Sequence, residues 1–517
     1  MDLFIKLGML VVFFAVTIGI GLYCRKHSTD VNGFVLGGRS VGPWLTAFAY
    51  GTSYFSAVVF VGYAGQFGWK YGVAATWAGI GNALLGSLLA WAFLGRRTRV
   101  MTQHLDSATM PQFFESRFNS KALKLAASAI IFIFMIPYTA SLYNGLSRLF
   151  GMAFDIDYSV CVIVMAVLTA IYVIAGGYMA TAINDFIQGI VMIVGIVAVI
   201  AAVLKGQGGF LSALDKLGQV SDPAVSTTPG VFASFFGPDP VNLLGVVLLT
   251  SLGTWGLPQM VQKFYAIKSE QAINKGMIIS TLFAAIVAGG CYFLGGFGRL
   301  FDVDVATQGY DAVIPTMLSG LPTVLIAMVI VLVLAASMST LSSLVLTSSS
   351  TLTLDFIKGT LVKKMDEKKQ LLCMRALVVV FIVISVVLAI VQYKSNVTFI
   401  AQLMGVSWGA LAGAFLAPFL FGLYWKKATR ASVWCSFLFS TVVMLGNTVA
   451  KPLFPAMLQS PINAGAFCMI MGLIIVPVVS LITPKMDKAY VDQVFSCYDR
   501  TVTVSVTDSI GDSQNKK

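Results

Sequence analysis

The stretch Ala336-Ser-Met-Ser-Thr-Leu-Ser-Ser343 places five hydroxyl side chains inside a hydrophobic segment that runs from about residue 314 to residue 355. An apolar membrane helix has little use for so many hydroxyls unless something polar meets them there. Ser339, Ser342 and Ser343 are spaced i, i+3 and i+4, so their oxygens share one helical face. Neutral oxygens without carboxylates suit a hard monovalent cation such as Na⁺ rather than zinc or copper. The alternative is helix packing, with hydroxyls that bond to their own carbonyls, and spacing alone leaves both readings open.

A second polar interruption, Ala49-Tyr-Gly-Thr-Ser-Tyr-Phe-Ser-Ala57, lies midway along the hydrophobic segment at residues 41–66. Glycine and small polar residues at this depth predict a broken helix, which a membrane tolerates only where the break lines a cavity. An unwound turn frees backbone carbonyls. Hydroxyls from one helix and free carbonyls from another would together form an all-oxygen cation cage.

The composition excludes an ordinary soluble domain. Of the 517 residues, 57% are hydrophobic and only 11% are charged, and the mean hydropathy is +0.86. The first hydrophobic run lacks a basic region before it and a small-residue cleavage motif, which predicts a helix that stays in place. The net charge of +12 does not indicate nucleic-acid binding, because the basic residues lie in short loops. Seven scattered cysteines without a CxxC pair predict neither a disulfide framework nor a metal site.

Four motifs together resemble the sodium:solute symporter family, whose members carry sugars, proline, pantothenate, sialic acid or iodide with sodium. The motifs are Ala336-x-x-Ser339-Thr340, the break from Gly51 to Ser56, Gly176-Gly177 before Asn184-Asp185-x-x-Gln188, and Trp255-Gly256-x-Pro258-Gln259. The resemblance covers roughly residues 4–483. It implies sodium-driven transport rather than catalysis, with a small solute, sodium ions and the lipid bilayer as partners and no obligate protein partner.

Hydrophobic runs of about twenty residues predict an all-α membrane protein with about thirteen transmembrane helices. They lie near residues 4–24, 41–66, 72–95, 122–150, 157–176, 183–204, 241–262, 274–297, 314–352, 372–392, 397–424, 431–450 and 462–483. Alternating the loops puts basic clusters such as Arg25-Lys26, Arg96-Arg97 and Lys363-Lys364 on one side, together with Lys263 and Lys268. By the positive-inside rule this side is cytoplasmic. The chain is therefore expected in the plasma (inner) membrane, with the N-terminus outside and the C-terminus inside.

The predicted layout is one transmembrane domain, residues 1–483, and a polar cytoplasmic tail, residues 484–517. Spans two to six and seven to eleven form two sets of five, about residues 41–204 and 241–424. Each set begins with an interrupted segment, at Gly51 and at Gly253-Thr-Trp-Gly-Leu-Pro258. Because five is odd, the two sets have opposite orientations. This predicts a LeuT-type inverted repeat, with one span before it, two after it, and a site at the repeat interface.

The family resemblance implies a main sodium site, with carbonyls of Thr52, Phe55 and Ala336 and hydroxyls of Ser339 and Thr340. Some members have a second sodium site, whose residues would here be Asp185, Ser342 and Ser343. A bound ion and a waypoint on the exit path both remain open for this second group.

Asp185 is the only acidic residue inside a predicted span, and an intramembrane carboxylate is a functional candidate because leaving it unpaired is expensive. The alternative is that Asp185 caps a helix that starts near residue 183 in the membrane interface.

The solute is expected beside the two breaks. Candidate contacts are Tyr54, Ser56, Val58 and Val59 from the first break, Tyr138, Ser141 and Asn144 from the fourth span, Thr254, Trp255 and Gln259 from the second break, and Gln402 or Trp408. Tyr138 matches a substrate-contacting position of proline-type members, whereas Val58-Val59 replaces the polar pair of sugar-type members. Met135 lies near the position of a basic residue in sialic-acid members, and Tyr54 replaces an acidic residue of proline-type members. A pocket without a fixed charge favours an uncharged, zwitterionic or carboxylate solute, such as an amino acid, pantothenate or a monocarboxylate.

Other function classes were weighed against this one. Alternatives within the fold are a sugar or sialic acid symporter, a channel, or a sensor derived from a transporter. An intramembrane enzyme is disfavoured, because the only histidines, His27 and His104, are expected in cytoplasmic loops and the spans offer no pair of nucleophile and base.

Overall fold

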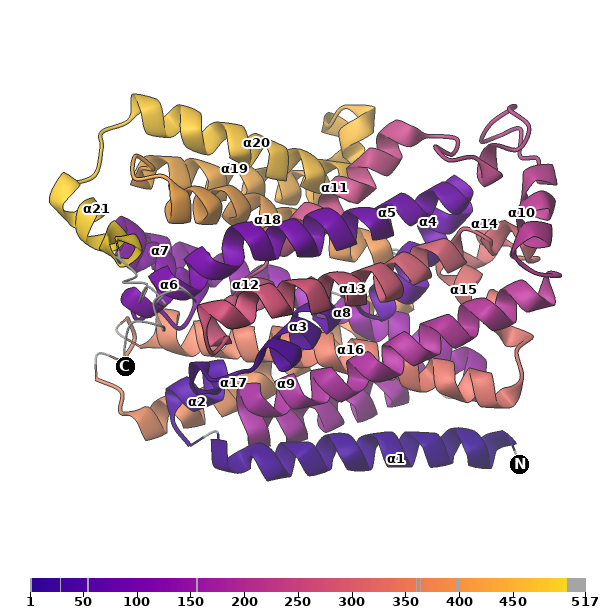
Figure 1. Ribbon diagram of the computed structural model, residues 1–517, viewed down its shortest axis with the longest axis horizontal. Coiled ribbons are helices and arrows are strands. Elements are labelled where there is room, and N and C mark those ends of the chain that lie inside the picture. Colours follow the sequence, from indigo (N-terminus) through magenta and orange to yellow (C-terminus); the bar gives the residue numbers. More distant parts are fainter. Residues whose placement is uncertain are drawn as a thin grey trace, which may run out of the picture.

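The computed structural model describes residues 2–27, 29–53, 55–154, 157–358, 360–362, 364–395 and 400–499. Within these ranges the chain is helical, and β pairing is limited to isolated bridges. Figure 1 shows long helices that run roughly side by side along the longest axis of the molecule. Ten helices are long and apolar enough to cross a membrane, or eleven if a bent pair counts as one span. The predicted all-α membrane fold is confirmed.

The first half of the chain contains the first break and two very long elements. Its helices are α1 (Asp2–Tyr23), α2 (Val31–Leu36), α3 (Pro43–Thr52), the π-helical segment η3 (Val58–Tyr63), α4 (Ala64–Tyr71), α5 (Thr76–Gly81), η5 (Asn82–Leu89), η6 (Trp91–Gly95), α6 (Arg96–His104), α7 (Met110–Phe118), α8 (Lys121–Phe154), α9 (Tyr158–Gly206) and α10 (Phe210–Gln219). From Val58 to His104 the chain is almost continuously helical.

The second half contains the second break. Its main helices are α11 (Pro240–Gly256), α12 (Pro258–Ala266), α13 (Glu270–Gly295), α15 (Val313–Ser319), α16 (Thr323–Thr351), η10 (Leu352–Ile357), α17 (Glu367–Ser395), α18 (Ile400–Tyr424), α19 (Arg430–Val449), α20 (Pro461–Ile482) and α21 (Lys488–Phe495). The axes of α11 and α12 differ by 45° across Leu257. Every described residue of α16 from Val329 to Thr351 is buried, so this helix forms the centre of the molecule.

Helix α9 bends at Gly177, whose φ of +54° is not helical. A side chain is strained at such a φ, and a Cβ at this position would lie only 2.9 Å from the backbone oxygen of Phe34. The helix has 49 residues, which would span about 74 Å if straight, far more than a bilayer core of about 30 Å. The glycine therefore marks the point where the long element changes direction.

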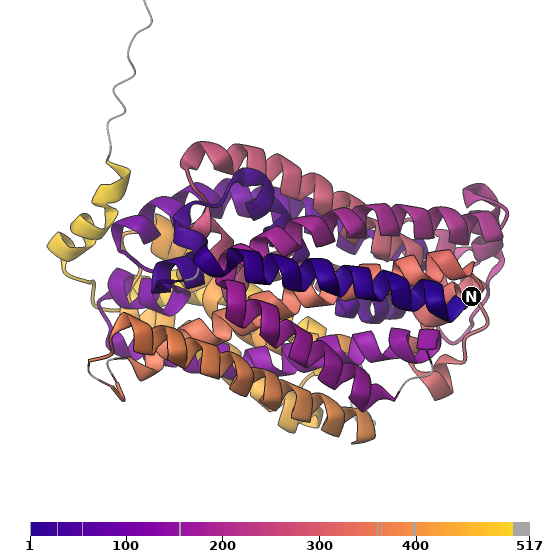
Figure 2. The ribbon, with the colours of Figure 1, turned by 90° about the horizontal axis from the view of Figure 1, so that it is seen from below.

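The two ends of the molecule differ in what they carry. In Figure 1 the N-terminal end of α1 and helix α10 lie at one end, while α6, α7 and α21 gather at the other. At this second end, the Lys426 ammonium pairs with the Asp492 carboxylate at 2.8 Å. The Arg97 guanidinium lies there between the rings of Tyr424 and Tyr498, 4.1 and 4.6 Å from their centroids. Figure 2, the view from below, shows the same lengthwise arrangement of helices.

Helix α13 packs against α4 and α5 through glycines. A Cβ at Gly68 would overlap the carbonyl of Gly295, and a Cβ at Gly295 would overlap the carbonyl of Ala64. Gly79 faces the backbone of Gly289 in the same way. Small residues allow such close approach of helix backbones in membrane proteins. The backbones of α13 and its two neighbours are therefore in direct contact at two heights.

Candidate functional site

The first break lies where the sequence predicts it. Helix α3 ends at Thr52, and the next helical segment, η3, follows Ala57. The N–H of Ala57 is held by the Ser337 hydroxyl of α16 at 3.2 Å. Thr52, Phe55 and Ser56 are fully buried. The break therefore presents unwound backbone to α16 inside the protein.

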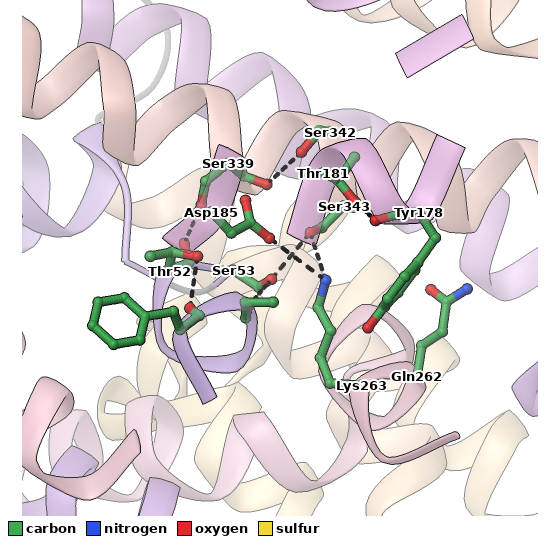
Figure 3. Close-up of polar contacts among 12 residues, drawn as sticks. Thr52, Ser53, Tyr178, Thr181, Asp185, Gln262, Lys263, Ser339, Ser342 and Ser343 are labelled. Atoms are coloured by element: carbon green, nitrogen blue, oxygen red, sulfur yellow. Dashed lines mark hydrogen bonds and ion pairs between the residues drawn. The ribbon is translucent and has the colours of Figure 1, made fainter. Parts of the chain in front are cut away.

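Five oxygens of the predicted main site meet between the break and α16. The Thr340 hydroxyl oxygen lies 3.1 Å from the carbonyl oxygen of Thr52, 3.2 Å from that of Phe55 and 3.1 Å from that of Ala336. The Ser339 hydroxyl lies 2.9 Å from the Thr52 carbonyl. Figure 3 shows Ser339 and Thr52 facing each other across this gap.

This cluster holds more acceptors than protons. One hydroxyl has a single proton, so the Thr340 hydroxyl can donate to only one of the three carbonyls around it. A small cation among these oxygens would satisfy all of them, and neutral oxygen donors are the ligands that hard cations take. The Thr52 hydroxyl donates to the Phe48 carbonyl of its own helix at 2.8 Å, so Thr52 offers its carbonyl. The residues present fit a monovalent cation such as Na⁺.

A second cluster, one turn further along α16, carries charge. The Asp185 carboxylate of α9 and the Lys263 ammonium of α12 lie 4.0 Å apart, and their side chains are 0% and 2% exposed. The ammonium donates to the Ser343 hydroxyl at 3.1 Å, and this hydroxyl lies 3.0 Å from that of Ser53. Figure 3 shows the lysine reaching up from α12 to both partners, beside the ring of Tyr178.

Several predictions about this cluster are wrong. Lys263 is not in a cytoplasmic loop, because α12 continues to Ala266 and buries it. Asp185 lies in the middle of α9 and caps no helix. It is also not the only acidic residue in a span, since the span that contains α16 extends to Ile357 and includes the buried Asp355, which accepts a hydrogen bond from Thr109 at 2.7 Å.

The three residues predicted for a second sodium site have different surroundings. Asp185 and Ser343 both contact or approach Lys263, whereas the Ser342 hydroxyl donates to the Ser339 carbonyl of its own helix at 2.9 Å. Gln188, one turn after Asp185, is buried, and its amide has no hydrogen-bond partner among the described residues. Lys263 and Gln188 were not singled out as site residues from the sequence.

Two candidate solute contacts lie beside the second break. The Tyr138 ring of α8 packs edge-on against Trp408 of α18, with centroids 6.0 Å apart. A Cβ at Gly253, at the end of α11, would lie 2.5 Å from the Trp408 ring. Gln259, in the first turn of α12, is fully buried, and neither end of its amide has a hydrogen-bond partner in the part of the chain that the structure describes. Buried polar groups nearly always have a partner, so this amide is a natural contact for a polar solute.

The other candidates use their polar atoms inside the protein. Thr254 and Trp255 donate to the carbonyls of Gly86 and Leu85, each at 2.8 Å. Ser141 donates to the Tyr138 carbonyl at 2.6 Å. The remaining ones are the Asn144 amide oxygen, which accepts from the Tyr158 hydroxyl, the Ser56 hydroxyl, which accepts from the Val58 N–H at 3.2 Å, and the apolar, buried Val59. Tyr54 lies outside the described residues.

A cavity of about 950 Å³ lies at the end of the molecule that carries α10. It is lined by residues of both signs and by two amides, among them Lys70, Asp239, Arg299, Gln66 and Gln402. The Gln66 side chain lies between the first break and this cavity in the chain order and is itself buried. The cavity gives a polar entrance of the size that a small organic solute needs.

Comparison with known proteins decides the family. The family model described as "Sodium:solute symporter family" matches residues 34–438, which is most of the chain. The chain belongs to the sodium:solute symporter family. It is a multi-pass membrane protein of sodium-coupled symport and not an enzyme, since the family and its relatives are transporters.

Relatives and solved structures agree with this assignment. Sodium/proline symporters of Staphylococcus aureus, for example of strains JH9 and NCTC 8325, are 30% identical over 495 residues, which cover 93% of this chain and 92% of theirs. A Na⁺-coupled sialic acid symporter in a substrate-bound outward-open state shares the fold, with a TM-score of 0.74 and 17% identity, over 94% of this chain and 98% of that one. A manganese transporter of Eremococcus coleocola is more distant, with a TM-score of 0.50 and 11% identity over 88% of this chain and 96% of its own.

Proposed function

We propose that this symporter imports a small uncharged, zwitterionic or carboxylate solute together with Na⁺ by alternating access, with an amino acid as the first candidate. The observation that carries the proposal is the cluster of Thr340 with three carbonyls at 3.1–3.2 Å and the adjacent Ser339. An ion held there would connect the first break to α16. Its binding energy would then favour one arrangement of these two elements over another, which is the requirement for coupling.

The solute would lie beside this ion, between the two breaks. Tyr138 and Trp408 offer aromatic surface there, and Gln259 offers an amide whose donor and acceptor both lack a described partner. The first turn of α12 also presents the positive end of a helix dipole, which favours a carboxylate group of a solute. The nearby charges of Asp185 and Lys263 offset each other, so the region carries no net charge. A zwitterion such as an amino acid fits these groups, and the relatives are sodium/proline symporters.

The membrane arrangement belongs to the same proposal. The 49-residue α9, bent at Gly177, and the 47-residue stretch Val58–His104 are each long enough for more than one crossing. If α9 crosses twice and the first break lies within a span of its own, the count reaches the thirteen spans and the 5+5 inverted repeat that the sequence predicts. The end with α6, α7 and α21 would face the cytoplasm, and the end with α10 would face outward, in the plasma membrane.

The orientation has a direct test. A cysteine at Gly208 should react with an impermeant thiol reagent from outside, and one at Lys364 only after permeabilisation. The opposite pattern would overturn both the orientation and the repeat assignment.

The transport proposal is tested in proteoliposomes that contain the purified protein. Radiolabelled L-proline, other neutral amino acids, pantothenate and short monocarboxylates are offered with an inward sodium gradient and with the gradient replaced by choline. One of them should accumulate only with the gradient, and the initial rate should saturate with solute concentration. Accumulation that ignores sodium would refute coupling, and a rate that does not saturate would indicate a channel.

A further inference from the structure

The second cation position of this chain is filled by its own lysine. The Lys263 ammonium donates to the Ser343 hydroxyl at 3.1 Å and lies 4.0 Å from the Asp185 carboxylate. Both charged side chains are essentially inaccessible to solvent. An ammonium carries the same single positive charge as Na⁺, and here it faces a carboxylate and a hydroxyl oxygen, which are the groups that a sodium ion would use.

A sodium ion cannot share this place with the ammonium. Two positive charges would then face one carboxylate within a few ångströms and without water between them, where repulsion is only weakly screened. Among the described residues, Asp185 is the only acidic side chain within ion-pair distance of Lys263. The carboxylate can therefore balance one cation, and that cation is attached to α12.

The tethered ammonium also connects to the main site. The Ser343 hydroxyl that accepts from Lys263 lies 3.0 Å from the Ser53 hydroxyl. Ser53 directly follows Thr52, whose carbonyl belongs to the main cluster, and Ser343 lies one turn after Ser339 and Thr340 on α16. Lys263 thus links α12, which follows the second break, to the first break through two hydroxyls.

We propose that Lys263 acts as a tethered cation at the second position, so that the protein binds one Na⁺, at the main site, in each transport cycle. The proposal rests on the proposed sodium-coupled transport, and it specifies the number of ions. It also predicts that removing the ammonium, while the carboxylate stays, makes room for a second sodium ion between Asp185 and Ser343.

The test counts sodium ions directly and needs no knowledge of the solute. Binding of radioactive sodium to the purified full-length protein is measured to saturation by a scintillation proximity assay. The wild type should bind one ion per protein, and Lys263→Ala should bind two. Lys268→Ala, which removes an exposed lysine five residues later, should bind one ion with the affinity of the wild type.

A double variant separates charge from packing and remains informative if Lys263→Ala does not fold. Asp185→Asn/Lys263→Gln removes both charges at similar volume and should again bind one ion. Two ions in the wild type, or one ion in a folded Lys263→Ala with unchanged affinity, would overturn the tethered cation while leaving sodium-coupled transport intact. No sodium bound by the wild type would instead overturn the proposed function and the tethered cation together.

Discussion

Two cation positions lie one helical turn apart on α16, and they are built from opposite materials. The first contains only neutral oxygens, from Thr52, Phe55, Ala336, Ser339 and Thr340. The second contains a full negative charge, Asp185, and a full positive charge, Lys263. Carbonyl and hydroxyl oxygens bind a monovalent cation without neutralising it, so the ion can leave again. A cation on a side chain cannot leave at all.

This difference teaches how one helix can offer two similar positions and still exchange a single ion. The neutral cluster is left with unsatisfied acceptors when no ion is present. The charged cluster is satisfied by the fold itself. The predictions below test this contrast, from the position where a substitution should do the most damage to the one where it should do the least.

The largest effect is expected from separating the charged pair. Asp185→Asn leaves the Lys263 ammonium buried without a counter-charge, and breaking one partner of a buried pair typically costs about 3–5 kcal/mol of folding free energy. Thermal unfolding in detergent should show a much lower midpoint for Asp185→Asn. The double variant Asp185→Asn/Lys263→Gln should recover most of the loss, because no unpaired charge remains. Equal midpoints for the single and the double variant would show that the two charges do not depend on each other.

The neutral cluster should respond in sodium dependence rather than in stability. Thr340→Ala removes the hydroxyl that lies within 3.2 Å of three carbonyls. We expect the sodium concentration for half-maximal uptake to rise about tenfold, which corresponds to about 1.4 kcal/mol. Ser349→Ala is the matched control, since the Ser349 hydroxyl is buried on the same helix and bonds only to its own Leu346 carbonyl. A tenfold shift in Ser349→Ala as well, or none in Thr340→Ala, would contradict the assignment.

The solute side of α12 should be separable from its charged side. Gln259 lies one turn before Lys263, and its amide has no partner among the described residues. Gln259→Leu should raise the solute concentration for half-maximal uptake several-fold, because one hydrogen bond to a bound ligand contributes about 1 kcal/mol. The number of sodium ions bound should stay the same. Gln271→Leu on the exposed start of α13 controls for general effects, and a loss of sodium binding in Gln259→Leu would mean that both ends of α12 serve the ion.

The smallest effects are expected from the two later serines, which the sequence treats alike. Ser342→Ala removes a hydroxyl that bonds within its own helix, so uptake should change by less than about twofold, since such bonds contribute little to a helix. Ser343→Ala removes the hydroxyl that accepts from Lys263 and should lower the unfolding midpoint more than Ser342→Ala does. Identical midpoints for the two variants would speak against a role of Ser343 in holding the ammonium.

The sequence predicted the parts of the site that depend on local chemistry. Glycine and small polar residues around Gly51 predicted the break, and the spacing of Ser339 and Thr340 predicted their common face. Both follow from backbone geometry and helix periodicity, which neighbours along the chain determine. The close approach of these two stretches, nearly 290 residues apart, came from the family resemblance and not from spacing.

Lys263 shows where such reasoning fails. A lysine at the end of a hydrophobic run looks like a loop residue, and the positive-inside rule then assigns it to the cytoplasm. The 45° turn between α11 and α12 sends the chain back into the protein instead. A signal was present, because Asp185 needed a cationic partner and Lys263 is surrounded in sequence by Met260, Val261, Phe264 and Tyr265. Only the fold shows that the two charges meet.

The glycine contacts of α13 have a mechanical consequence. Where Gly68 meets Gly295, and Gly79 meets Gly289, there is no side chain to deform between the backbones. Close-packed interfaces of this kind do not yield gradually. Any opening or closing of the transporter must therefore carry α4, α5 and α13 as one stiff body, and the first break, joined to α4 through η3, must travel with them. The main ion cluster straddles the border between this body and α16, so a bound ion acts as a latch across the joint at which the transporter moves.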